Sequence, residues 1–443
     1  MNPRSFAVAA ARQVLLLIGI VTGARAQSAQ SAPSASCPGS WSTPFRVQRA
    51  DGRPVFVEPG PIAPLGRATL AIGGPTFFWL GKDHLVVPQD MATDSAQVRW
   101  AVTRSGALID STGTAIALAS IGSGQEWKHP GLLAWSNRRL DVAWSARDSA
   151  GTITGTPNDD TQIGVASFDG HRWTAPRTVL RATQVRLIDP PAMRAGTPFD
   201  VGVVAATVRD SAGHAVRVAR QIAGDWVTAD WRGATAVHFA SAVTVSDGSV
   251  VVVMMVTSKD GSAGVYSLSA DRWPTWSAPQ RIDSLRSGVG FAAFAWARLG
   301  ADSLVVVWNQ SGAGVSRLGL TTALSVDGAK SWRLMAPLIV RASSIDDPRL
   351  AVDAQGHLHA VFGTSTFDAA AYAPGPITHA IWQSGTWTTP TAVSTEASVT
   401  APGLGFAPGG RLMATWSEDV ETPHGPVPRT LASFWTPNCP TRR

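Results

Sequence analysis

The chain has 443 residues, of which 42 are Gly, 30 Pro and 18 Trp, whereas only 2 are Tyr and 15% are charged. Long amphipathic helical patterns are missing and apolar residues recur mainly at every second position, which excludes a helical bundle and favours an all-β repeat protein. The formal net charge is +6, but the arginines are scattered rather than gathered on one face, so we expect no nucleic-acid partner.

The N-terminus has the three zones of a secretory signal peptide. Arg4 and Arg12 flank the start of the chain, the apolar run Val14–Val21 follows, and Ala24-Arg25-Ala26 predicts cleavage after Ala26. That run is shorter than the roughly 20 residues that span a bilayer, and no later stretch qualifies. We therefore expect a secreted or periplasmic protein without a membrane span. Residues 27–36 are predicted to be a disordered leader and residues 37–443 a single domain.

Tryptophans, most of them followed by a nearby proline, recur through this domain. Positions 173, 226, 276, 332 and 387 are Trp and lie 53, 50, 56 and 55 residues apart. A period near 50 with several short strands in each period is typical of a β-propeller, because one small twisted sheet cannot bury both of its faces alone. We expect an all-β propeller of four-stranded antiparallel blades, with seven blades, or six if residues 66–120 are an insertion.

Residues 325–332, SVDGAKSW, stand between two alternating runs and are predicted to form a tight turn between antiparallel strands. Asp327 can bond nearby backbone N–H groups, Gly328 tolerates a positive φ, and Trp332 can fold back over the turn. The octet resembles the Asp box, Ser-x-Asp-x-Gly-x-Thr-Trp, of the sialidase-like β-propellers, with Ala329 in place of Gly and Ser331 in place of Thr. The resemblance implies a propeller with structural outer-rim residues Ser325, Asp327, Gly328 and Trp332.

The last unit, residues 402–436, ends before a fourth strand. Residues 41–47, WSTPFRV, have the same Trp-x-x-Pro form as the outer strands of the other units. We therefore expect the N-terminal strand to complete the last blade and to close the ring. The only two cysteines, Cys37 and Cys439, fall where that hairpin would turn, and we expect a disulfide between them, which an exported compartment permits. The alternative is two unpaired buried thiols.

Acidic, basic and aromatic residues gather in the loops expected at the propeller's mouth. The densest cluster is Asp346-Asp347-Pro348-Arg349, which could bind a cation, share a proton, or hold a carboxylate or sugar hydroxyl. Its structural alternative is a capped loop in which Arg349 pairs with an Asp. The segment Glu126–His129 sets an acid and an imidazole beside a stacking Trp, which suits sugars, or else is an exposed loop. The candidate ligand-binding residues are Glu126, Trp127, His129, Trp308, Asp346, Asp347, Arg349 and Glu418.

The resemblance also implies a catalytic set against which the sequence can be compared. Family sialidases use an arginine triad, a Tyr/Glu nucleophilic pair and an Asp acid/base, with an early Phe/Tyr-Arg-Ile-Pro segment. The nearest segment is Pro44-Phe45-Arg46-Val47, and the only tyrosines are Tyr266 and Tyr372. This set cannot be assembled from the sequence. His357 and His359 alternate along one strand face and are expected to pack between blades rather than to bind metal.

We therefore expect an exported, monomeric propeller that binds a glycan or a protein or peptide ligand at its central mouth without catalysis, cofactor or metal site. The alternative is a divergent sialidase-like glycoside hydrolase or lyase. It would use rim carboxylates, Asp346 or Asp347 together with Glu126 or Glu418, at a separation of about 5–10 Å.

Overall fold

The computed structural model describes part of the chain. The described residues are 39–46, 90–93, 99–102, 107–109, 115–117, 128–134, 140–146, 161–168, 174–175, 177–187, 202–259, 261–285, 290–311, 318–340, 344–368, 371–397, 402–406, 412–423 and 425–437. The chain divides into two units, Met1–Ser36 and Cys37–Arg443, so all the described residues belong to the second. The predicted signal peptide and leader lie outside them.

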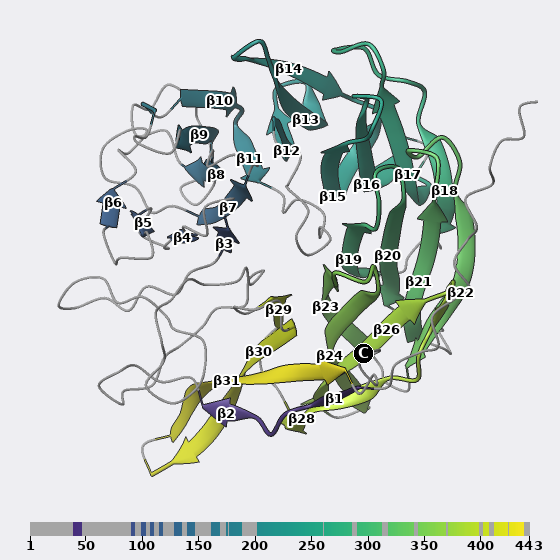
Figure 1. Ribbon diagram of the computed structural model, residues 1–443. Helices are drawn as coiled ribbons and strands as arrows, with labels where there is room; N and C mark the ends of the chain where they lie inside the picture. The colour runs from purple at the N-terminus through teal and green to yellow at the C-terminus, as the bar shows by residue number, and fades with distance from the viewer. Residues whose placement is uncertain are drawn as a thin grey trace, which may run out of the picture. The chain divides into compact units, whose positions relative to one another are not determined.

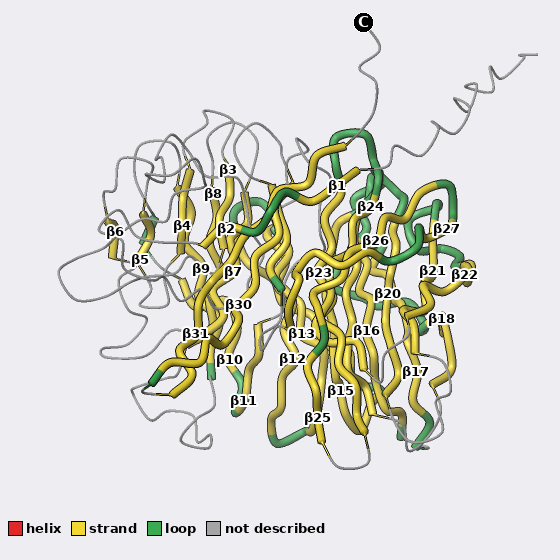
Figure 2. Tube along the Cα trace, turned by 90° about the horizontal axis from the view of Figure 1, so that it is seen from below, coloured by secondary structure: helices red, strands yellow, loops and turns green. Residues whose placement is uncertain are grey.

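The described part is all-β. Figure 2 shows strands and connecting loops there and no helix, so it contains no helix that could cross a membrane. The strands form antiparallel sheets, most of them four-stranded, in which strands consecutive in sequence lie side by side (Figure 1). This meander is consistent with the blades of the expected propeller.

The sheets follow the chain in order. The first contains β3 (Asp90–Thr93), β4 (Arg99–Val102), β5 (Ala107–Ile109) and β6 (Ala115–Ala117); the second contains β7 (Lys128–Ala134), β8 (Leu140–Ala146), β9 (Gln162–Phe168) and β10 (Arg177–Arg181). The third contains β11 (Gln184–Leu187), β12 (Val203–Asp210), β13 (Gly213–Ile222) and β14 (Asp225–Trp231). The fourth contains β15 (Ala234–Thr244), β16 (Val250–Ser258), β17 (Ala263–Ala270) and β18 (Gln280–Leu285).

The fifth sheet contains β19 (Gly290–Arg298), β20 (Leu304–Ser311), β21 (Leu318–Ser325) and β22 (Arg333–Val340). The sixth contains β23 (Ser344–Val352), β24 (Leu358–Asp368), β25 (Ala371–Pro374), β26 (Pro376–Gln383), β27 (Thr386–Trp387) and β28 (Thr391–Ala397). The last contains β29 (Gly403–Phe406), β30 (Leu412–Thr422), β31 (Gly425–Pro437), β1 (Gly39–Trp41) and β2 (Phe45–Arg46).

The core lies between successive sheets. The second strands β16 and β20 are continuous runs of Val, Met and Trp whose side chains are buried on both faces. Alternate residues point to opposite neighbours: Val251 and Val253 pack toward the fifth sheet, whereas Val250 and Val252 pack toward the third. The same alternation joins the fifth to the sixth sheet and the sixth to the last. The third to sixth sheets each bury both faces because each has a neighbouring sheet on either side.

The two ends of the chain meet in one sheet, as the sequence predicts. On β1, Trp41 pairs with Trp435 of β31 and Gly39 pairs with Pro437. On β2, Phe45 pairs with Ala432. Because β31 also pairs with β30 along its length, the N-terminal segment adds the outer strand that the last unit lacks. Cys37 and Cys439 lie outside the described residues.

The sixth sheet departs from the predicted plain four-strand unit in two places. Before Pro376 the chain forms an additional hairpin of β24 and β25, in which Phe367 pairs with Tyr372. The outer strand is split into β27 and β28, with Pro390 between them, because proline cannot donate a hydrogen bond to the ladder. The first sheet, β3 to β6, lies within residues 66–120, which the sequence left open as a blade or an insertion, and it is four-stranded.

Candidate functional site

Strand order determines which ends of the sheets can form a common surface. After four antiparallel strands the chain is back at the end of the sheet at which the first strand began. The next sheet starts from that same end, as β15 shows by beginning only three residues after the end of β14. The first strands also contact one another, for example β19 with β23 and β23 with β29, and are therefore the innermost. We call the end at which β7, β11, β15, β19, β23 and β29 begin the mouth end.

Four innermost strands have a register break within their first five residues. One extra residue interrupts the pairing of β7 between Lys128 and Gly131, of β15 between Val237 and Phe239, of β19 between Phe291 and Ala293, and of β23 between Asp346 and Arg349. Such bulges take residues out of the ladder and turn side chains to new directions, and they are frequent beside functional sites.

The breaks contain several of the residues that the sequence singles out. His129-Pro130 lies in the break of β7 and Asp347-Pro348 in that of β23. A proline is tolerated there because the extra residue makes no ladder bond. His238 occupies the break of β15, and its Nε2 lies 3.0 Å from Thr257 Oγ1. Burial, assisted by nearby His214, lowers the pKa of His238. His238 is not among the ligand-binding residues predicted from the sequence, although it starts the run HFASAVTV.

The start of β23 is fixed from the neighbouring sheet. Asn309, near the end of β20, is completely buried and its Nδ2 donates a hydrogen bond of 2.9 Å to the carbonyl of Ile345. Asn309 pairs with Ala293, the first residue after the break in β19. One buried amide thus connects two adjacent bulged strands and positions the segment that contains Asp346, Asp347 and Arg349. Arg349 is half-buried; the side chains of the two aspartates lie outside what is described.

Trp308 and Glu418 are both buried. Trp308 is completely buried in the apolar cluster between the fourth and fifth sheets, so it packs the core instead of presenting a stacking surface for a ligand. Glu418 is 3% exposed and accepts a hydrogen bond of 2.9 Å from Trp416 Nε1. It lies beyond the pairing of Thr415 with Gly403, toward the mouth end. Glu126 and Trp127 lie outside the described residues, and so do the side chains of Lys128 and His129.

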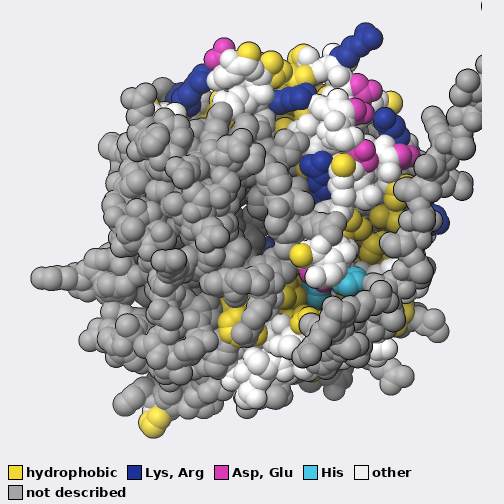
Figure 3. Space-filling view, viewed as in Figure 1, with side chains coloured by type: hydrophobic (Ala, Val, Ile, Leu, Met, Phe, Trp, Pro, Cys, Tyr) yellow, Lys and Arg dark blue, Asp and Glu magenta, His cyan; other side chains and the backbone are white. Residues whose placement is uncertain are grey.

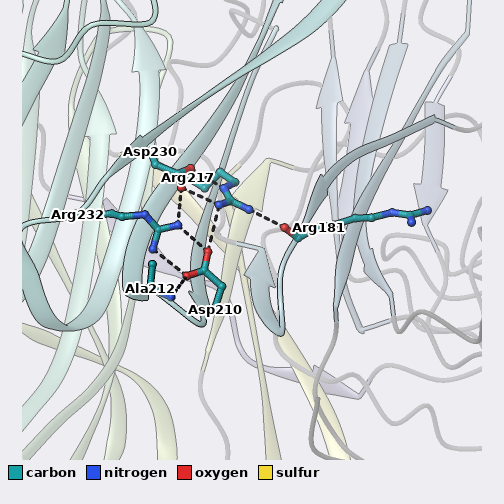
Figure 4. Close-up of polar contacts among 6 residues, drawn as sticks. All are labelled: Arg181, Asp210, Ala212, Arg217, Asp230 and Arg232. Atoms are coloured by element: carbon teal, nitrogen blue, oxygen red, sulfur yellow. Dashed lines mark hydrogen bonds and ion pairs between the residues drawn. The ribbon is translucent and has the colours of Figure 1, made fainter. Parts of the chain in front are cut away.

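A network of two aspartates and two arginines, which the sequence did not reveal, lies at the mouth end of the third sheet (Figure 4). Arg217 bonds Asp230 and donates to the carbonyl of Arg181 on β10, and Arg232 makes two bonds to Asp210 of 2.9 and 2.6 Å. The hydrogen bond from Arg232 holds the pKa of Asp210 low. Burial raises the pKa of Asp230, but the bonds and charges of Arg217 and Arg232 outweigh it and the net shift is downward.

This network stabilises the sheet and leaves no unpaired charge on Arg217 for a ligand. Arg217 uses its donors on Asp230, Asp210 and a backbone carbonyl of the second sheet, so its guanidinium is already committed within the protein. On the coloured part of the visible face, Figure 3 shows Lys and Arg side chains interspersed with Asp and Glu. Within the described residues no group of three or more His, Cys, Asp or Glu side chains could hold a metal ion.

The Asp box lies at the opposite end, between the third and fourth strands of the fifth sheet. Asp327 Oδ1 accepts from Ser325 Oγ at 2.8 Å and from the Ser331 N–H at 2.9 Å, and Ser325 Oγ accepts from the Ala329 N–H at 2.9 Å. The turn also contacts the hairpin between β19 and β20, where the Gly328 N–H donates to the Asp302 carbonyl. These contacts give the octet a structural role, as the motif predicts.

Comparisons with known proteins give structural similarity only. No family model and no curated protein sequence matches the chain. Among solved structures, a protein of unknown function from Dyadobacter fermentans is 14% identical over 70% of this chain and 94% of its own, with a TM-score of 0.39. Trypanosoma rangeli sialidase is 11% identical over 73% of this chain and 56% of its own, with a TM-score of 0.38. A polysaccharide lyase described as an ulvan lyase is 11% identical over 66% and 77%, with a TM-score of 0.45. We carry over no residue or activity from these proteins.

Proposed function

We propose that the protein is an exported β-propeller, closed by its N-terminal strand, that binds a glycan or an extended peptide at the mouth end without catalysis. The observation that carries this proposal is the recurrence of a bulge near the start of four innermost strands. Each bulge places one extra residue outside the ladder at the same end of its sheet. The breaks contain the half-buried His238 and the backbone of Asp347, beside the buried Pro348.

The chemistry of these residues suits a polar, hydroxyl-rich or amide-rich ligand. A neutral imidazole can both donate to and accept from hydroxyl and backbone groups, and a carboxylate accepts from them. Asn309 supports the proposal because it fixes the carbonyl next to Asp346 from a neighbouring sheet, and a site held in place before the ligand arrives loses less entropy on binding.

The experiment is a glycan-array and peptide-array screen of the mature protein, followed by titration of any ligand against variants. Asp347→Ala and His238→Ala are expected to weaken binding at least tenfold, whereas Lys330→Ala, an exposed side chain at the Asp-box end, is expected to leave it unchanged. Equal binding by all three variants would place the ligand elsewhere on the molecule.

Glu418 favours a second function, that of a divergent glycoside hydrolase or lyase. A buried carboxylate held by an indole N–H at the mouth end is a candidate acid or base. Hydrolysis of any chromogenic glycoside that is abolished by Glu418→Gln, which can still accept the Trp416 hydrogen bond, would replace the binding proposal by this one.

A further inference from the structure

Three ionisable side chains meet on the face of the sixth sheet that packs against the last sheet. His359 on β24 and His379 on β26 are 2% and 1% exposed, and His359 Nδ1 lies 3.0 Å from His379 Nε2. The other ring nitrogen of His359, Nε2, lies 3.4 Å from Asp353 Oδ2. The two rings are stacked with their centroids 5.3 Å apart. A chain of hydrogen bonds therefore runs from the carboxylate, through one imidazole, to the second.

Two tryptophans of the last sheet cover the inner end of this chain. The centroid of the His379 ring lies 5.0 Å from that of Trp41 on β1, edge to face, and 4.6 Å from that of Trp435 on β31. The two indoles lie 5.5 Å apart and belong to directly paired residues. His379 is therefore where the sixth sheet touches the N-terminal strand, and its ring cannot be hydrated while that strand is in place.

The geometry limits how many protons the pair can hold. A hydrogen bond between two imidazoles needs one N–H and one lone pair, so the pair can carry one proton beyond the neutral state. A second proton would place two positive charges on nitrogens 3.0 Å apart. The charged group that contacts the pair is Asp353, in the turn after β23. His357, just before β24, is a titratable neighbour of that carboxylate, because its Nδ1 lies 2.9 Å from Asp353 Oδ2. Among the described residues, β1 and β31 contact the pair through the indole rings of Trp41 and Trp435.

We propose that the His359–His379 pair and Trp41 form a proton-sensitive latch that holds the N-terminal strand on β31 at neutral pH and releases it in acid. β1 has only three residues at the edge of its sheet, so it belongs to the least stable part of the fold and can open by itself. When it opens, water reaches His379 and the ring can take up a second proton that the closed seam excludes.

The direction of the pH effect follows from proton linkage. Burial lowers the pKa of His379 well below 6.5 in the closed state, and the charge of His359 adds to the shift. Opening of β1 removes Trp41 and lets water reach the ring, while Trp435 and His359 stay in place. The proton affinity of His379 therefore rises toward its ordinary value, and in acid the open state binds more protons than the closed one. Acid therefore favours opening, by about tenfold for each pH unit until the closed state is protonated as well. Above pH 6.5 His379 is neutral in both states, and opening no longer depends on pH through this ring.

The test is amide hydrogen exchange of the full chain under reducing conditions, so that no disulfide can tether β1, at pH values from 7.5 to 5 and corrected for the intrinsic pH dependence of exchange. The amide of Ser42, which bonds the Phe434 carbonyl at 2.8 Å, is expected to lose protection about tenfold per pH unit below pH 6.5. The strand Val250–Ser258, buried in the fourth sheet, is expected to stay protected throughout.

Two variants separate the latch from a general acid effect. His379→Phe keeps an aromatic ring but cannot take up a proton, and should abolish the pH dependence at Ser42. His238→Gln removes another histidine whose pKa burial lowers, in the fourth sheet, and should leave that dependence intact. In the wild-type protein, two results would overturn the proposal: protection at Ser42 that is constant from pH 7.5 to 5, or protection at Ser42 that falls together with that of Val250–Ser258. Both are measured without His379→Phe, so the test does not depend on whether that variant folds.

Discussion

Neighbouring sheets are joined by the same hydrogen bond at two places, and this bond gives the sharpest test of how they pack. Trp387 Nε1 donates to Thr322 Oγ1 of the preceding sheet at 2.8 Å, and Trp332 Nε1 donates to Ser267 Oγ of the sheet before it at 2.9 Å. In both pairs the tryptophan follows the hydroxyl residue by 65 positions. In the fifth and sixth sheets this tryptophan therefore fastens its sheet to the preceding one.

Thr322→Val removes the acceptor with little change of shape. Thr322 is completely buried, so the indole N–H of Trp387 loses its partner in a place that water does not reach. An unsatisfied buried donor costs about 1–3 kcal/mol, whereas the net contribution of the hydrogen bond itself is about 1 kcal/mol. We expect Thr322→Val to lower the free energy of unfolding by about 2 kcal/mol, and Trp387→Phe to lower it further through lost packing.

The measurement is a double-mutant cycle by urea unfolding with Thr322→Val, Trp387→Phe and the double variant. The coupling energy between the two positions is expected to be about 1 kcal/mol, because the second substitution removes a donor that is already unsatisfied. Trp276→Phe is the matched control, since the Trp276 Nε1 is buried without a hydrogen-bond partner in the described part of the chain. A coupling energy within 0.3 kcal/mol of zero, about the limit of additivity for independent sites, would refute the role assigned to this bond.

Three further predictions follow from other parts of the structure. Asp327→Ala removes the acceptor of the Ser325 and Ser331 hydrogen bonds and should destabilise the protein by about 2 kcal/mol. Ala329→Gly, at a φ of 67°, should not destabilise it, because glycine adopts positive φ without strain. If urea unfolding found Ala329→Gly the more destabilising of the two, the structural role of this turn would be contradicted. If the register of Gly39 and Pro437 continues for two residues, Cys37 faces Cys439. Non-reducing peptide mapping of protein produced in an oxidising compartment should then find the two cysteines linked, and free thiols at both would be the opposing result. Burial raises the pKa of Asp353, but hydrogen bonds from His359 and His357 and the charge of His359 outweigh it and lower the pKa from 3.8 to about 2. The contribution of Asp353 to stability, about 2 kcal/mol, is therefore present above pH 3.8 and is lost as pH falls to 2. Asp353→Asn should remove that slope from the profile of unfolding free energy against pH, and an unchanged profile would argue against the assignment.

Much of the strand plan could be predicted because it depends on local pattern. Alternating apolar residues marked the strands of the third to sixth sheets, and the Asp box marked the turn before Trp332. The Trp-x-x-Pro form of residues 41–44 identified the N-terminal segment as an outer strand, and its pairing with β31 confirms this. The prediction that His359 packs between sheets is also confirmed by its contact with Trp435.

The candidate site was harder to predict because it depends on register. A single extra residue in a strand such as β15 does not disturb the alternation enough to be seen, so the bulge that presents His238 was missed. The network of Asp210, Arg217 and Asp230 joins three strands. It becomes visible only once the register is known, which places Arg217 of β13 opposite Asp230 of β14. Trp308 was predicted to face the ligand, but the sequence alone does not show which neighbouring sheet covers a given face of β20, and the structure buries it completely.

The pairing of the two chain ends in one sheet is the central claim, since the bulged mouth end and the histidine latch both presuppose it. Ser40 and Thr436 are paired and exposed, so cysteines at these positions, in a chain with serine at positions 37 and 439, can be tested for disulfide formation under mild oxidation. We predict that Ser40→Cys links to Thr436→Cys in nearly every molecule, whereas Ser40→Cys with Ser433→Cys, three residues out of register, does not link. Absence of the first link, or equal linking of both pairs, would contradict the account.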